Sequence, residues 1–246
     1  MNKLMLAAVL LVSLVGNTAM AVSDEVRDVL VQQLQKVDSR LLVKSIQDSA
    51  LPGLYEVVLE GGDFLYMDQE GKHFVVGHLY EINDDAGMVN LTEKAQDLMR
   101  VEVLSQVPAS EQIIYPAQGE RKATILVFTD VDCPYCRRIH EEIPELSKMG
   151  VQVNYLAFPR GGPNTATYNT MVSIWCGEGD ERNELMDKVK GGLTISNKSC
   201  DNAVLDQFRV GQSVGVTGTP AIVLENGALL PGYMPAARLA QVLGIN

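Results

Sequence analysis

Apolar and polar positions divide the chain into two units joined by a helical segment. The first unit begins with a helix, because Val26, Leu30 and Leu34 recur at helical spacing. Short apolar runs then predict strands over 54–59, 64–67 and 73–82. A unit of about 60 residues with few large apolar side chains is marginal alone. We therefore expect a second copy to complete it through a strand edge.

A polar break at residues 84–87 separates this unit from a second helical pattern. Asn90 and Glu93 have the spacing of a capping box, which marks the start of a helix. The pattern continues to about Val107, with Arg100 among its polar positions. We interpret residues 22–84 as the first domain and residues 85–109 as a linker helix. The alternative is that this helix is the first helix of the second domain.

Strand and helix patterns alternate in the second domain, residues 110–246. They predict strands over 123–129, 151–158 and 220–224, and helices over 134–149 and 235–243. Pro144 should break the longer helix, and Asn226-Gly227 predicts a hairpin turn. A helical stretch from about residue 164 to 215 is inserted before the last strands. This order predicts an α/β thioredoxin-like domain with a helical insertion, following an α+β N-terminal domain and a helical linker.

The first 21 residues have the composition of a secretory signal peptide. Lys3 precedes an apolar run of about a dozen residues, and Ala19 and Ala21 form a small-residue cleavage pattern. The run is shorter than the roughly twenty apolar residues that span a bilayer. We expect cleavage after Ala21 and an exported protein that does not insert into a membrane. A structural N-terminal helix is the alternative.

Charge and motif content exclude several classes of function. The chain has 31 acidic and 20 basic residues, a formal net charge of −11. Proteins that bind nucleic acid need clustered Lys and Arg, so no nucleic-acid partner is expected. His140-Glu141 lacks the second His of a zinc-protease helix and indicates a solvated helix face. We expect neither a metal nor a cofactor.

Cys133 and Cys136 carry the chemistry that the sequence predicts. A strand pattern precedes them and a helix pattern follows, so Cys133 lies at a helix N-terminus with Pro134 at the first helical position. Unpaired N–H groups and the helix dipole lower the pKa of a thiol there, and the thiolate is the form that attacks disulfides. We predict an exposed nucleophile, Cys133, and a resolving thiol, Cys136, one turn deeper. A permanent structural disulfide is the alternative.

Cys176 and Cys200 form a second pair of cysteines. An even number of cysteines in an exported chain favours disulfides. A bridge between these two would close a loop of about 25 residues, worth about 3.5 kcal/mol in the chain-entropy model. We interpret the pair as a structural disulfide. A four-thiolate zinc site is the alternative, although the close paired spacing of zinc ribbons is missing.

Several stretches of the second domain resemble the DsbC family of periplasmic disulfide isomerases. They are residues 127–130, 155–160, 174–176, 218–221 and 226–233. The resemblance implies a periplasmic homodimer joined through its N-terminal domains. It also implies misoxidised exported proteins as substrates and the membrane reductase DsbD as electron donor. By the same resemblance, the Thr219–Pro220 bond is cis beside the dithiol, and the Thr219 backbone pairs with an extended client.

Pro134-Tyr135 is one departure from the DsbC pattern, in which Gly-Tyr usually separates the cysteines. The related DsbG family has Pro-Tyr but lacks a counterpart of the Cys176–Cys200 pair. The dipeptide bears on the redox potential more than on the reaction class. We expect a protein disulfide isomerase and thiol:disulfide oxidoreductase. The alternatives are a DsbG-like reductase of single oxidised cysteines and a dimeric holdase chaperone with secondary thiol chemistry.

We expect the charged residues near the dithiol to have little influence on its chemistry. Asp130 and Asp132 are expected to be solvated loop acids. Arg137 and Arg138 are expected to be exposed helix cations. Val127 occupies the position where thioredoxins keep a buried carboxylate, so no proton relay from that position is expected.

Overall fold

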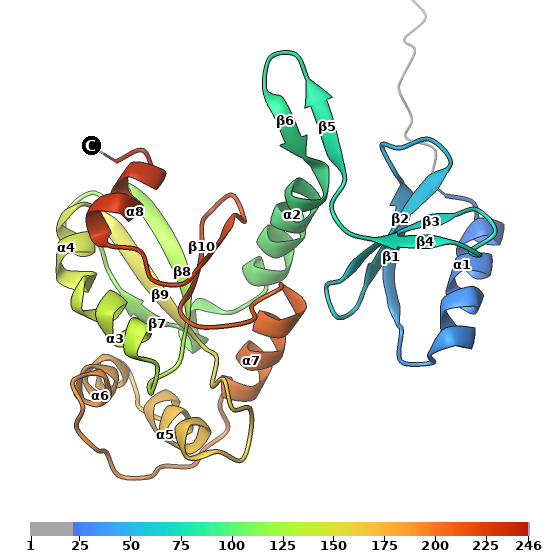
Figure 1. The fold of residues 1–246 in the computed structure, drawn as a ribbon. Helices are drawn as coiled ribbons and strands as arrows, with labels where there is room; N and C mark the ends of the chain where they lie inside the picture. The colour runs from blue at the N-terminus through green and yellow to red at the C-terminus, as the bar shows by residue number, and fades with distance from the viewer. Residues whose placement is uncertain (1–21, 246) are drawn as a thin grey trace, which may run out of the picture.

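A computed structural model describes residues 22–245 of the chain. Helix α2 (Leu91–Ser105) lies between an N-terminal unit and a larger C-terminal unit (Figure 1). The predicted signal peptide and its cleavage after Ala21 fall outside the described residues. Within residues 22–245, no helix combines the length and the apolar character that crossing a bilayer requires.

The N-terminal unit packs one helix against an antiparallel sheet. Helix α1 (Asp24–Val37) begins after Ser23, whose side chain caps it by accepting a hydrogen bond from the Val26 N–H. The apolar face of α1 covers a sheet of order β1-β2-β3-β4. Its strands are β1 (Val43–Asp48), β2 (Leu54–Leu59), β3 (Phe64–Asp68) and β4 (Phe74–Val76). The apolar side chains of β4, at the edge of the sheet, are exposed.

A β-hairpin occupies the region that the sequence predicts as a break. Strands β5 (Tyr80–Asn83) and β6 (Gly87–Asn90) pair antiparallel. The Asn83 side chain accepts hydrogen bonds from the N–H groups of Asp85 and Ala86, each at 3.0 Å. Most of β5 lies within the predicted strand region 73–82, but β6 and its pairing with β5 were not predicted, because the hairpin lacks a buried face: Ile82 is 91 % exposed and Met88 72 %. The polar residues 84–87 are therefore a turn.

Helix α2 contacts both units. Asn90 is the N-cap of α2, because its side chain accepts from the Glu93 N–H at 3.1 Å. The reciprocal half of the predicted capping box differs, because the Glu93 carboxylate accepts from the Asn90 side-chain amide at 3.2 Å and not from its backbone N–H. Thr92 accepts from the backbone N–H of Leu79, which ties the helix to the N-terminal unit. Arg100, one of the polar positions of the pattern, is buried and donates to the Val214 carbonyl at 3.0 Å. The helix therefore packs against the second unit and is not an isolated spacer.

The C-terminal unit is built on a five-stranded sheet of order β11-β10-β8-β9-β7. Strands β8 and β9 are parallel, and the other neighbours are antiparallel. The strands are β7 (Ile113–Tyr115), β8 (Ala123–Thr129), β9 (Val151–Ala157), β10 (Ala221–Val223) and β11 (Leu229–Pro231). The sequence did not predict β7, which follows a short 3₁₀ turn, η1 (Ala109–Glu111).

Helices cover both faces of this sheet (Figure 1). They are α3 (Pro134–Glu141), α4 (Ile143–Lys148), α5 (Ala166–Trp175), α6 (Glu181–Lys190), α7 (Val204–Ser213) and α8 (Ala236–Val242). One face packs against α3, α4, α8 and the inserted α5 and α6, and the other against α7 and α2. The predicted helix 134–149 breaks at Glu142, just before Pro144.

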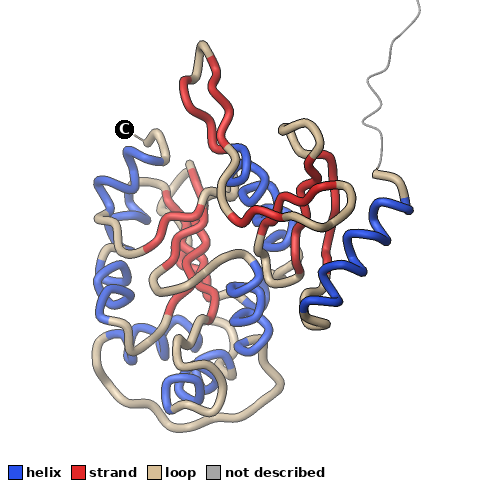
Figure 2. Tube along the Cα trace, turned by 45° about the vertical axis from the view of Figure 1, so that its right-hand side comes forward, coloured by secondary structure: helices blue, strands red, loops and turns tan. Residues whose placement is uncertain are grey.

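The insertion lies between β9 and β10 and contains α5, α6 and α7. The segment 191–203 joins α6 to α7 without a helix or strand and is drawn as a long tan loop in Figure 2. An α/β domain of the predicted thioredoxin-like class, with its helical insertion, is thus present. It places the turn from β8 to α3 beside the loop that precedes β10, where the candidate site lies.

Candidate active site

The two thiols of the Cys-Pro-Tyr-Cys motif lie at the junction of β8 and α3. Cys133 is the N-cap of α3, and its carbonyl accepts from the Arg137 N–H at 3.1 Å. Cys133 and Cys136 are not bridged to each other. The expected exposure of Cys133 is wrong, because the residue is only 1 % exposed. Its thiol lies against the loop before β10 and donates to the Thr219 carbonyl at 3.2 Å.

The local environment shifts the pKa values of the two thiols in opposite directions. Burial would raise the pKa of Cys133, but the hydrogen bonds that its thiolate can accept from the Thr219 hydroxyl, from the Cys136 N–H and thiol and from the Tyr135 N–H outweigh it. The pKa of Cys133 is therefore lowered. Burial raises the pKa of Cys136 and outweighs the opposing charge of Lys190. One thiol favours the thiolate and the other the neutral form.

The loop from Gly215 to Ala221 covers the dithiol. The Thr219–Pro220 peptide bond in it is cis. The Thr219 hydroxyl oxygen is buried and has no hydrogen-bond partner of ordinary geometry among residues 22–245. A buried hydroxyl without a partner is uncommon, and here it is available to a thiolate. The loop also lines a cavity of about 200 Å³, together with Leu229, Pro231 and Gly232.

Asp130 holds the segment between β8 and α3 in place. It was expected to be solvated, but its residue is 2 % exposed. One carboxylate oxygen accepts from the Asp132 N–H at 2.8 Å. The other accepts from the backbone N–H and Nε of Arg160 at 2.9 and 3.0 Å. The sequence could not reveal this ion pair, because its partners are 30 residues apart on different segments.

A polar cluster behind the dithiol was also missed by the sequence. His140, expected on a solvated face, has a side chain only 14 % exposed and approaches Asp187 at 3.2 Å and the Tyr155 hydroxyl at 3.3 Å. Burial lowers the pKa of His140 to about 4. Lys190 is 5 % exposed and donates to Thr129 and to the Asp130 carbonyl. Nothing in the sequence separates Lys190 from an ordinary solvated helix lysine.

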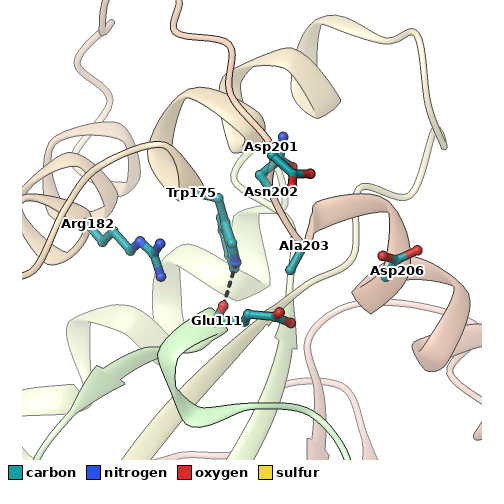
Figure 3. A pocket seen from close by; sticks show the side chains of 7 residues that line it. All are labelled: Glu111, Trp175, Arg182, Asp201, Asn202, Ala203 and Asp206. Atoms are coloured by element: carbon teal, nitrogen blue, oxygen red, sulfur yellow. Dashed lines mark hydrogen bonds between the residues drawn. The ribbon is translucent and has the colours of Figure 1, made fainter.

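The second cysteine pair lies in the insertion. Cys176 and Cys200 form a disulfide with a Cα–Cα distance of 5.8 Å. The neighbouring Trp175 is 2 % exposed, and its indole N–H donates to the Glu111 carbonyl at 2.9 Å (Figure 3). The tryptophan borders a pocket of about 270 Å³ that excludes Cys133 and Cys136. Across the described residues, no group of His, Cys, Asp and Glu side chains has the geometry of a metal site.

Comparison with known proteins gives matches along most of the chain. The model of the disulfide bond isomerase protein N-terminal domain matches residues 17–93, and the thioredoxin-like domain model matches residues 110–244. The thiol:disulfide interchange protein DsbC of Escherichia coli K12 is 36 % identical over 85 % of this chain and 86 % of its own. The Salmonella typhimurium DsbC is 39 % identical over 76 % of this chain and 75 % of its own. A solved disulfide interchange protein from Neisseria gonorrhoeae is 27 % identical over 56 % of this chain and 96 % of its own, with a TM-score of 0.49.

Proposed function

Because the chain belongs to the DsbC family of thiol:disulfide interchange proteins, we propose that it isomerises wrong disulfides of exported proteins through the Cys133–Cys136 dithiol. One observation carries the assignment of these residues. An unbridged thiol with a lowered pKa lies at the start of α3, and a second thiol with a raised pKa lies one turn deeper. The first is suited to attack and the second to delayed resolution.

The proposed reaction begins when the Cys133 thiolate attacks a client disulfide. The client S–S bond breaks, a Cys133–client disulfide forms, and one client sulfur leaves as a thiolate. That thiolate attacks another disulfide of the client, and the rearranged client then releases Cys133 without net oxidation. If rearrangement stalls, Cys136 attacks the mixed disulfide and releases a reduced client. Electrons from a membrane reductase of the DsbD type would then restore the dithiol.

Thr219 and Pro220 are proposed to hold the client beside the dithiol. The loop that contains them borders both Cys133 and the cavity of about 200 Å³. An extended client segment could pair with the Thr219 backbone, as in strand addition. Because Cys133 is 1 % exposed, the client sulfur has to displace the contact between its thiol and the Thr219 carbonyl. Binding and exposure of the nucleophile would thus be coupled.

We further propose a periplasmic homodimer that joins through the N-terminal unit. Edge strand β4 exposes Phe74, Val75 and Val76 by 52, 60 and 67 %. An apolar edge strand is a template for pairing with another chain. The N–H of Val76 faces the free edge, because Val76 and Leu65 are a non-hydrogen-bonded pair of the β3–β4 ladder, whereas Val75 bonds to β3. A Val76→Pro substitution removes this edge donor and should yield monomers in sedimentation velocity. A dimer that persists in this variant would contradict pairing through β4.

Reactivation of scrambled ribonuclease tests the proposed chemistry. The parent protein should restore ribonuclease activity, and Cys133→Ser should not rise above the uncatalysed rate. Cys136→Ala should still form mixed disulfides with exported proteins that carry several cysteines. Trapping only proteins with a single cysteine would favour the DsbG-like reductase. Aggregation suppression that survives a Cys133→Ala, Cys136→Ala double substitution, with no thiol-dependent reactivation in the parent, would favour the holdase.

A further inference from the structure

Lys190 is a buried amine to which the proposed reaction gives no role. It ends α6 and is 5 % exposed. Its Nζ donates to the Thr129 hydroxyl at 2.7 Å and to the Asp130 carbonyl at 3.0 Å, both neutral acceptors. Among residues 22–245, no carboxylate lies within ion-pair distance of it. A buried ammonium without a counter-charge is costly, so its position calls for an explanation.

Acidic groups near Lys190 are engaged elsewhere. The Asp130 carboxylate pairs with Arg160 at 3.0 Å. Asp187, also on α6, accepts from the Tyr115 hydroxyl at 2.6 Å and approaches His140 at 3.2 Å. The ring of Tyr155, on β9, lies with its centroid 5.7 Å from Nζ and supplies no charge. The remaining titratable groups that face the amine are on or beside α3: Cys133, Cys136, Arg137 and His140.

Cys136 is the group whose ionisation would supply the missing negative charge. Thr129 accepts the hydrogen bond from Lys190, and its hydroxyl can donate to a Cys136 thiolate, which lowers the pKa of Cys136. Burial raises the pKa of Cys136, and the charge of Lys190 is the strongest influence against that rise. Burial lowers the pKa of Lys190 to about 8, and a negative Cys136 is the strongest influence against that fall. The amine and the thiol therefore favour each other's charged forms.

We propose that Lys190 is a positioning residue for the resolving step, which stabilises the Cys136 thiolate through Thr129 as Cys136 attacks the mixed disulfide at Cys133. This inference rests on the proposed function. In that step the Cys136 sulfur bonds to Cys133 and the Cys133–client bond breaks. The departing client sulfur takes the electron pair of that bond and the proton that Cys136 released. The enzyme dithiol is oxidised by two electrons, and the client disulfide is reduced by two.

Lys190→Met keeps the length of the side chain and removes its charge. In a Cys133→Ser background, where Cys136 is the free thiol of the motif, the pKa of Cys136 should rise by about one unit, which ultraviolet thiolate absorbance measures. With both thiols present, the rate of resolution at neutral pH should fall about tenfold, and its pH profile should move to higher pH. Attack by Cys133, measured in a Cys136→Ala background, should change little.

Three further variants distinguish the loss of the Lys190 charge from a general folding defect. Lys188→Met removes an exposed lysine from the same helix and should leave both steps unchanged. Thr129→Val keeps Lys190 but removes the hydroxyl between amine and sulfur, so it should also slow resolution, and Thr129→Ser should restore it. If circular dichroism shows that Lys190→Met does not fold, the comparison of Thr129→Val with Thr129→Ser tests the proposal in its place.

Two results distinguish this inference from the proposed function. If Cys133→Ser still reactivates ribonuclease, the proposed function fails, whatever Lys190 does. If Cys133 is required but Lys190→Met leaves the pKa of Cys136 and the resolution rate unchanged, only the role of Lys190 is overturned. Equal slowing of attack and resolution would likewise overturn it, because a general structural defect would affect both steps.

Discussion

The two cysteine pairs of this chain occupy opposite kinds of environment. Cys133 and Cys136 are one turn apart at the start of a helix, almost fully buried, and surrounded by hydrogen-bond donors and a buried amine. Cys176 and Cys200 are 24 residues apart, and Cys200 is exposed at the end of a loop. The first pair carries two free thiols, whereas the second pair is bridged and closes a loop.

This difference shows that pairing and reactivity depend on surroundings more than on the cysteines themselves. At the dithiol, a helix terminus, the Thr219 hydroxyl and Lys190 all favour negative charge on sulfur. The bridged pair cannot titrate, and the adjacent Trp175 donates an indole N–H hydrogen bond to the Glu111 carbonyl. Substitutions at Cys133 and Cys136 should therefore abolish thiol reactivity, whereas substitutions at Cys176 and Cys200 should lower stability.

The largest expected effect is the loss of stability when the bridged pair is removed. A Cys176→Ala, Cys200→Ala double variant should lose about 3.5 kcal/mol of unfolding free energy, because its unfolded chain is no longer constrained. Urea unfolding measures this loss. Ribonuclease reactivation per folded molecule should remain. The matched control is the Cys133→Ala, Cys136→Ala variant, which should lose less stability and all activity. Equal losses of stability in both variants would contradict the division of roles.

A smaller expected effect is a pH dependence of the unfolding free energy that arises beside the dithiol. The pKa of His140, behind the dithiol, is lowered by burial from 6.5 to about 4. Between these values the unfolded chain binds a proton that the folded chain does not. The free energy of unfolding should therefore fall by roughly 3 kcal/mol as the pH decreases through this window.

The difference between two unfolding series isolates the contribution of His140. His140→Gln should flatten the pH dependence of urea unfolding relative to the parent. His78→Gln, which removes an exposed histidine that makes no ion pair among the described residues, is the control for the substitution. Parallel curves for the parent and His140→Gln would show that His140 is not the titrating group.

The sequence correctly predicted those elements whose formation depends only on residues close together in the chain. The strand 123–129, the helix break before Pro144 and the cap at Asn90 each depend on neighbouring residues. Strand β6 and its pairing with β5 were missed because the exposed apolar residues of the hairpin produce no one-sided pattern.

In the candidate site, the motif cysteines and the loop before β10 were identified, whereas the groups that tune them were not. Lys190 reaches Thr129 across 61 residues, and Arg160 reaches Asp130 across 30. Such contacts arise only when helices and strands pack together. A buried lysine on an amphipathic helix has the same sequence pattern as a solvated one, and this explains why sequence reasoning assigned no role to Lys190.

Within the dithiol itself, the two thiols should titrate differently. In Cys136→Ala, alkylation of Cys133 should have a midpoint below the ordinary thiol pKa of 9.0, and in Cys133→Ala that of Cys136 should lie above it. Each unit of separation corresponds to about a tenfold difference in thiolate population at neutral pH. The same variants unfolded in urea provide the reference. Coincident midpoints in the folded variants would remove the distinction between nucleophile and resolving thiol.

The smallest expected effect concerns the unpartnered hydroxyl over the two sulfurs. Thr219→Val replaces that hydroxyl with a methyl group of similar size and removes one hydrogen-bond donor to the Cys133 thiolate. A single hydrogen bond contributes about 1 kcal/mol, so the pKa of Cys133 should rise by about half a unit to one unit. Attack on small disulfides at neutral pH should slow severalfold. Thr217→Val, on the exposed part of the same loop, should change neither quantity. If both substitutions act alike, the loop affects Cys133 through its backbone, and the hydroxyl has no separate role.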